Sequence, residues 1–196
     1  MADAYRPLPH HPLNQPVIVM TPPEGHSAAV SEQSPAITAM TDLSHIRPLM
    51  IDPFASMNDA NEKMIAYAVR MLFVAPSGQE MIGIITAADI LSEKPVQYMR
   101  EVNCAPGEVL VRDIMTPVAG LEVLRLDDVE RARIGDIIET LRHSGKQHAL
   151  VVQLGADGRE TVCGILSTSQ ISRLMNARVE VAEVATNFAA IQSALS

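Results

Sequence analysis

Gly83-Ile84-Ile85-Thr86-Ala87-Ala88-Asp89 decides the fold, because it runs an apolar strand directly into a helix and has a second copy in the chain. The second copy is Gly164-Ile165-Leu166-Ser167-Thr168-Ser169-Gln170. Two Met-Thr pairs, Met40-Thr41 and Met115-Thr116, lie upstream of the two copies at similar distances. Self-similarity over this length indicates an internal duplication rather than a single large motif.

Working outward from these junctions, each copy predicts an extended segment, an amphipathic helix, a hairpin and a second helix. In the first copy these elements are 47–51, a helix from Ser56 to about Tyr67 with a Ser56–Asp59 capping box, strands 69–74 and 81–86, and a helix from Ala87. In the second they are 121–126, a helix from about Ala132 to Ser144 ended by Gly145, strands 148–153 and 161–167, and a helix from Ser169. One such unit is too small to bury both faces of its sheet. The sequence therefore predicts an α/β (α+β) fold of two β-α-β-β-α repeats, packed sheet to sheet as a pseudo-twofold pair.

The expected domain organisation follows from these repeats and from composition. Residues 1–39 form a Pro-rich N-terminal arm, since seven of the thirteen prolines fall before residue 36. The first repeat spans 40–92, a linker 93–111, and the second repeat 112–176. Residues 177–196 continue as a C-terminal helix, because apolar residues recur every three or four positions from Leu174 to Leu195.

Composition excludes several classes of protein. Hydrophobic residues make up 47% of the chain, which is too many for a wholly disordered protein. The net charge of −8 gives no general footprint for nucleic acid or anionic lipid, so any anion site must be local. No stretch is long and apolar enough for a membrane span, and the N-terminus lacks the pattern of a signal peptide, which favours a cytoplasmic protein. Cys104 and Cys163 lack metal-ligand spacing, so no metal site is expected.

The paired units and their motifs resemble a CBS-domain pair, or Bateman module, over about residues 40–176. The resemblance rests on Gly83 to Asp89 and on Asp113-Ile114-Met115-Thr116-Pro117, which opens the second repeat. It implies a non-catalytic sensor that binds AMP, ADP, ATP or S-adenosylmethionine between the repeats and signals to a regulated partner of unknown identity. No catalytic domain accompanies the pair, so the module stands nearly alone. The resemblance also implies a homodimer.

Thr86 and Asp89 are the residues on which ligand binding depends. Thr86 is placed to cap the helix that follows it, and the Asp89 carboxylate can accept two hydrogen bonds from a vicinal diol such as ribose. The alternative is that the two residues form only a helix cap, with the acid favourably placed at the positive end of the helix.

The resemblance implies two clefts. The first is expected to contain Thr86, Ala88, Asp89, Gly120, Leu121, Val123, Lys146, Gln147, His148 and Ala149. Four basic or potentially basic residues near its edge, Arg142, His143, Lys146 and His148, are candidate phosphate ligands. The second, weaker cleft is expected to contain His45, Ile46, Arg70, Met71, Ser167, Ser169 and Gln170. There a neutral Gln170 replaces the carboxylate.

Two other functions remain open at this point. A dimerising interaction protein with vestigial clefts would need no ligand, and Gln170 favours vestigial use of one cleft. An enzyme acting on a nucleotide would need a positioned base, for which His148 is the only candidate. The intact Thr86 and Asp89 favour sensing.

Overall fold

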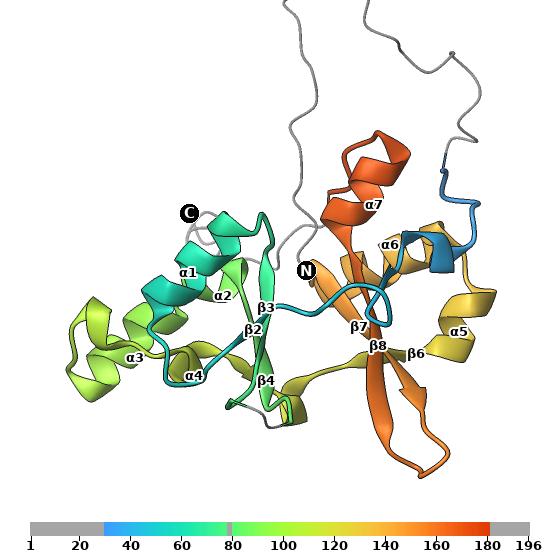
Figure 1. Ribbon diagram of the computed structural model, residues 1–196. Helices are drawn as coiled ribbons and strands as arrows, with labels where there is room; N and C mark the ends of the chain where they lie inside the picture. The colour runs from blue at the N-terminus through green and yellow to red at the C-terminus, as the bar shows by residue number, and fades with distance from the viewer. Residues whose placement is uncertain (1–29, 78–79, 181–196) are drawn as a thin grey trace, which may run out of the picture.

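The computed structural model describes residues 30–77 and 80–180, and these fold into two four-stranded sheets. Their strand orders are β2-β3-β4-β5 and β1-β8-β7-β6. Figure 1 shows α1–α4 grouped around the first sheet and α5–α7 around the second. Within the described ranges, no helix has the length and apolarity that crossing a bilayer requires.

The first sheet belongs mainly to the first repeat. β3 (Met71–Val74) pairs in parallel with β2 (Met50–Ile51) and antiparallel with β4 (Gly83–Thr86). Around it lie α1 (Met57–Ala66), α2 (Ala87–Leu91), α3 (Lys94–Val102) and α4 (Val111–Ile114), with a short 3₁₀ turn, η2 (Pro106–Glu108). The predicted capping box is confirmed, since Ser56 Oγ accepts from Asp59 N at 3.0 Å and the Asp59 carboxylate accepts from Ser56 N.

The second sheet repeats this arrangement with longer strands. β6 (Val123–Arg125) pairs in parallel with β7 (His148–Leu154), which pairs antiparallel with β8 (Glu160–Ser167). The helices are α5 (Leu126–Arg131), α6 (Ile134–Ser144) and α7 (Thr168–Met175). Gly145 ends α6 at φ 64°, the left-handed conformation that favours glycine, as the sequence predicts.

The segment that opens each repeat joins the sheet of the other repeat. β1 (Thr41–Asp42) pairs with β8, and β5 (Thr116–Pro117) pairs with β4. The 3₁₀ turn η1 (Ala36–Ala39) and α4 precede these strands and are exchanged with them: η1 packs on the second core and α4 on the first. The repeats are therefore contiguous in sequence but reciprocally exchanged in space.

Two glycines at corresponding positions make this exchange sterically feasible. A Cβ on Gly83 would overlap the backbone oxygen of Thr116 in β5. A Cβ on Gly164 would overlap Sδ of Met40, just before β1. Each glycine thus leaves room for the chain segment that arrives from the other repeat.

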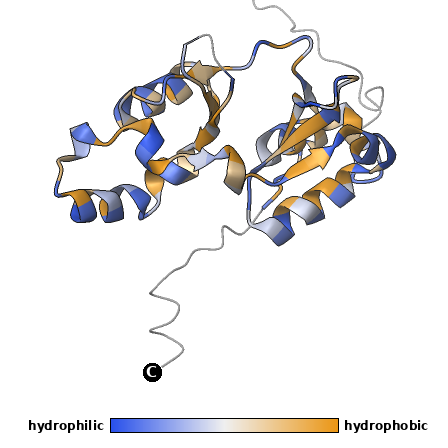
Figure 2. Cartoon of the chain, turned by 90° about the horizontal axis from the view of Figure 1, so that it is seen from below, coloured by the Kyte–Doolittle hydropathy of each residue, from blue (hydrophilic) through white to orange (hydrophobic). Residues whose placement is uncertain are grey.

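Three apolar clusters hold the structure together. One lies between the second sheet and its helices, around Leu141, Val151 and Leu166, and a second lies under the first sheet, around Leu72 and Ile85. The third joins the two sheets through Met71, Phe73, Ile84 and Leu150. Figure 2 shows the strands mostly hydrophobic, while much of the helix surface is hydrophilic. The predicted sheet-to-sheet packing is confirmed.

Two segments contain more structure than expected. In the arm, Ala36 and Ala39 are fully buried, and Ala36 N donates to Ala132 O at 2.9 Å, so residues 30–39 dock on the second half. The predicted linker 93–111 contains α3, and its Val109 is fully buried in the first core. Burial of apolar residues explains both cases, because a free arm or linker would leave that surface in water.

The predicted C-terminal helix is wrong at its beginning. α7 ends at Met175, and Asn176 adopts a left-handed conformation with φ 49°. The chain then turns back, with Ala177 N donating to Ser172 O at 3.1 Å. The rest of the apolar seam, from Val181 to Leu195, lies outside the described residues.

Candidate functional site

A cleft of about 540 Å³ opens between the two halves, where β4 runs into α2. Its volume lies within the range of about 300–1,000 Å³ that small-molecule sites occupy. The first half contributes Thr86 and Asp89, and the second contributes Leu121, Lys146, Gln147 and His148. Side chains that the sequence predicts from both repeats therefore meet in one cleft.

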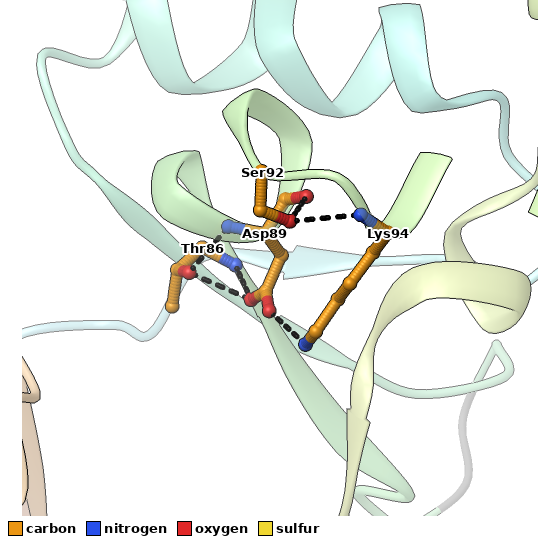
Figure 3. A network of polar contacts seen from close by, with 4 residues as sticks. All are labelled: Thr86, Asp89, Ser92 and Lys94. Atoms are coloured by element: carbon orange, nitrogen blue, oxygen red, sulfur yellow. Dashed lines mark hydrogen bonds and ion pairs between the residues drawn. The ribbon is translucent and has the colours of Figure 1, made fainter. Parts of the chain in front are cut away.

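The Thr86–Asp89 pair forms a tight local network at the start of α2 (Figure 3). Asp89 Oδ2 accepts from Thr86 N at 2.9 Å and from Thr86 Oγ1 at 2.6 Å, while Asp89 N donates to Thr86 Oγ1 at 3.2 Å. Asp89 is only 8% exposed, and it is the one buried charged residue among those that the structure describes. The helix cap that the sequence predicts is thus present, and it holds the carboxylate in a fixed orientation.

Lys94 occupies the other oxygen of this carboxylate. Its ammonium forms an ion pair with Asp89 Oδ1, and its backbone N–H donates to Ser92 Oγ at 3.2 Å (Figure 3). Lys94 is the first residue of α3, where a positive charge is unfavourable because the N-terminus of a helix is itself positive. The ion pair with Asp89 compensates for this. A carboxylate offers about four acceptor positions, and three of these are filled. A diol that donates both of its hydrogen bonds to Asp89 must therefore displace one of these three donors, of which Lys94 is one.

Arg70 and Gln147 lie at the meeting point of the two repeats. Each directly precedes the first residue of its central strand, since Met71 pairs with Thr86 and His148 pairs with Ser167. These equivalent side chains contact each other, with Arg70 Nη1 donating to Gln147 Oε1 at 3.4 Å. Arg70 lines both clefts. The sequence predicts Arg70 only in the second cleft, although its equivalence to Gln147 would have indicated both clefts.

His148 also lines both clefts, and it is mostly shielded from solvent. Burial, together with the nearby Arg70 guanidinium, lowers the pKa of His148 to about 4. The imidazole is therefore neutral at physiological pH. It can donate or accept a hydrogen bond, but it does not supply the positive charge that the sequence analysis considered for a phosphate.

The other candidate phosphate ligands are distributed unevenly. Lys146 lines the first cleft and donates to Glu122 at 2.6 Å, which lowers the pKa of that carboxyl. Arg142 lies beside a separate hollow, and His143 is exposed and lines neither the two clefts nor that hollow. The four residues therefore do not form a single cluster.

The second cleft, of about 440 Å³, lies beside the junction of β8 and α7. Ser167 caps α7, as Thr86 caps α2, and Ser167 Oγ accepts from Gln170 N at 3.2 Å. The Gln170 amide oxygen accepts from the Arg173 guanidinium. Ile46, Met71 and Ser169 also line this cleft, as the sequence predicts.

Four predicted site residues lie outside the two clefts. Ala149 faces the opposite side of β7, because side chains alternate along a strand and His148 and Leu150 already face the cleft. Gly120 and Val123 are exposed beside it. His45 is drawn away from the second cleft by Asp42, whose Oδ2 lies 2.9 Å from His45 Nδ1.

The chain and its fold can be compared with known proteins. A family model of the CBS domain matches residues 37–95. An uncharacterized conserved protein from Pyrococcus horikoshii has a TM-score of 0.51 and 21% identity, with 78% of this chain and 99% of that chain covered. Protein MJ1225 from Methanocaldococcus jannaschii has a TM-score of 0.50 and 20% identity, covering 70% of this chain and 48% of that one. The CBS-pair protein CBSX2 from Arabidopsis thaliana, in complex with AMP, has a TM-score of 0.49 and 23% identity, covering 71% and 94%. No curated protein matches the chain.

The matched segment 37–95 covers the first repeat, and the second repeat has the same strand order and the same capped strand–helix junction. The chain therefore contains a CBS domain, and its fold is that of a CBS-domain pair.

Proposed function

We propose that this protein is a non-catalytic regulatory module that binds an adenosine-containing ligand in the cleft beside Asp89. The ligand class is that of AMP, ADP, ATP or S-adenosylmethionine, and a regulated partner responds to the bound state. The observation that carries the proposal is a single buried carboxylate, fixed at a helix N-terminus, in a cleft that both repeats line.

The chemistry of the cleft suits a nucleoside. Asp89 offers an oriented acceptor for a ribose hydroxyl, and a hydrogen bond to a charged group is worth about 1.5–3 kcal/mol. Ile84, Leu121 and Leu150 supply apolar walls between which a flat base can lie. Burial of the base against these side chains is the main source of affinity, while the polar groups determine orientation.

Signalling requires that the ligand distinguish between two arrangements of the module. A ligand in this cleft contacts α2 from the first repeat and the start of β7 from the second. Binding therefore favours whichever relative position of the repeats fits the ligand best. The regulated partner then recognises that position.

A comparison of ribose with dideoxyribose tests the role of Asp89. In the unmodified protein we expect adenosine to bind at least tenfold more tightly than 2′,3′-dideoxyadenosine, because only adenosine has the diol. In Asp89→Ala the two compounds should bind equally, measured by calorimetry or by the shift in melting temperature.

Asp59→Ala is the matched control. Asp59 forms the same capping box with Ser56, but it lies outside the clefts. Both substitutions should cost about 1 kcal/mol of stability through the lost cap, and only Asp89→Ala should affect the ligands. If adenosine and its dideoxy form bind equally in the unmodified protein, Asp89 is a helix cap alone.

A second candidate function is a dimerising interaction protein with vestigial clefts. The engagement of Asp89 by Lys94 favours it, since that ion pair already occupies one oxygen of the carboxylate. Absence of any melting shift with adenosine, AMP, ATP or S-adenosylmethionine at millimolar concentration would establish this alternative. Mass spectrometry of small molecules released from the purified protein is the complementary measurement.

Either function is compatible with a homodimer. Large apolar side chains remain exposed around α1 and α2, among them Ile65 at 71% and Leu91 at 84%. A second copy of the chain would remove this surface from water. We expect light scattering at about 100 μM to give the mass of a dimer, and a monomer mass would exclude any dimer tighter than roughly −5.5 kcal/mol.

A further inference from the structure

A third hollow, of about 650 Å³, lies beside the N-terminus of α7 and gathers the side chains of Arg70, Arg142 and Arg178. Glu180 is the only acidic residue in its lining, among the residues that the structure describes. Such an excess of cations is unusual in a chain of net charge −8. The hollow is therefore a local anion-attracting site on an acidic protein.

Three separate parts of the fold bring these arginines together. Arg70 directly precedes β3, and Arg142 lies in the last turn of α6. Arg178 belongs to the segment that turns back after α7, where Val179 N donates to Ser172 Oγ at 3.0 Å. A helix C-terminus favours a cation for its own sake, but that explains only Arg142. The convergence of all three is a property of the tertiary structure.

The contacts that these arginines now make are weak enough to be replaced by an anion. Arg142 pairs with Glu139 at 3.0 Å and Arg178 with Glu180 at 3.4 Å, and both pairs are solvent-exposed. Exposed ion pairs contribute little to stability, because solvent and salt screen them. Guanidinium groups bind phosphate through two parallel, charge-assisted hydrogen bonds, which are stronger than bonds between neutral groups. A phosphate that enters the hollow can therefore compete with these carboxylates.

The hollow adjoins both clefts, because it shares Arg70 and Gln147 with the first and Arg70 and Ser169 with the second. Hydroxyl groups of Thr168, Ser169 and Ser172 lie along its wall and can donate to phosphate oxygens. In the first cleft itself the His148 imidazole is neutral, and the cations are Arg70 and Lys146, the latter in an exposed pair with Glu122. The larger concentration of positive charge lies in the arginine hollow, where three guanidinium groups meet.

We propose that this hollow binds the terminal phosphates of a nucleoside triphosphate whose nucleoside lies in the first cleft. This inference rests on the proposed function and specifies its ligand: the module responds to triphosphates more strongly than to monophosphates. Arg70 connects the two sites, and Arg142 and Arg178 hold the end of the phosphate chain.

Calorimetry with four probes tests the proposal on the full chain: ATP, AMP, adenosine and inorganic tripolyphosphate. We expect ATP to bind at least tenfold more tightly than AMP, and tripolyphosphate to bind by itself. The double variant Arg142→Gln/Arg178→Gln should lose tripolyphosphate binding and bring ATP to the affinity of AMP, leaving adenosine unchanged. Arg131→Gln/Arg159→Gln removes the same charge from exposed sites outside the hollow, and it should change none of these values.

The outcomes separate this inference from the proposed function. Adenosine binding without tripolyphosphate binding, or an unchanged ATP-to-AMP ratio in the arginine variant, overturns the phosphate site and leaves the nucleoside cleft intact. Equal losses in the two double variants overturn it as well, because the effect is then one of net charge. If tripolyphosphate binds through the arginines but adenosine does not bind, the nucleoside cleft fails and the hollow remains an anion site.

Discussion

The cleft beside α2 and the cleft beside α7 are built on the same capped strand–helix junction, yet their polar groups differ. At α2 the third helical residue is Asp89, which is paired with Lys94, and at α7 it is Gln170, which is bonded to Arg173. Thr86, the last residue of the strand that leads into α2, pairs with Met71. Ser167, the last residue of the strand that leads into α7, pairs with His148. The comparison teaches that the two junctions share a hydroxyl cap and a strand glycine, whereas the polar groups of the two clefts differ.

The same comparison applies to the exchanged strands. Gly83 faces the backbone of β5, whereas Gly164 faces the flexible side chain of Met40. Backbone atoms in a paired strand cannot move without breaking the ladder, but a methionine can change rotamer. The two halves therefore tolerate the same substitution differently.

The largest expected effect is that of alanine at these glycines. Gly83→Ala should destabilise the protein by about 3 kcal/mol, since overpacking against fixed atoms costs about 1–3 kcal/mol or more. Gly164→Ala should cost about 1 kcal/mol or less, because the methionine can move aside. Urea denaturation provides the measurement, and Gly107→Ala, with nothing within 4 Å of the added Cβ, is the control. Equal losses at Gly83 and Gly164 would show that the two exchanges are equally rigid.

A smaller effect is expected from pH, and its main source between pH 6.5 and pH 4 should be a histidine of the second half. His148 has a pKa of about 4 in the folded protein, against 6.5 for an unperturbed histidine. Between these values the unfolded chain binds the additional proton, so stability should fall as pH falls from 6.5 to 4 and then level off. The expected loss is on the order of 2–3 kcal/mol.

His148→Met isolates this contribution, because methionine is the residue at the corresponding position of the first repeat. His148 causes part of the difference in stability between about pH 7 and pH 4, and that part should be absent in the variant. The other titrating groups contribute in both proteins. Melting curves across this pH range are sufficient. If the unmodified protein and the variant show parallel curves, His148 is not held neutral by its surroundings.

The smallest effect is the difference in affinity between the clefts. A charged acceptor for a diol is worth about 1.5–3 kcal/mol and a neutral one about 0.5–1.5, so the Asp89 cleft should bind adenosine nucleotides roughly tenfold more tightly. In calorimetry, Asp89→Ala should abolish the tighter phase and Gln170→Ala should preserve it. Equal losses from the two variants would contradict the asymmetry, and tight binding after Asp89→Ala would place the ligand elsewhere.

The sequence by itself determined the local elements, because their causes lie within a few residues. The capping boxes at Ser56–Asp59 and Thr86–Asp89 form between residues three apart, and Gly145 ends α6 through its own backbone conformation. The hairpins and the duplication were readable for the same reason. Seven of the ten residues expected in the first cleft line it, since the junction at Asp89 and the start of β7 are local features as well.

Only the tertiary structure decided which residues meet across the repeats. The exchange of β1 and β5 depends on which sheet edge is free, and nothing near Thr41 or Thr116 in the chain specifies that edge. The role of Arg70 in both clefts and the gathering of three arginines follow from this packing. Contacts between residues far apart in sequence depend on how whole sheets pack, and this information is not carried by the few residues around either partner.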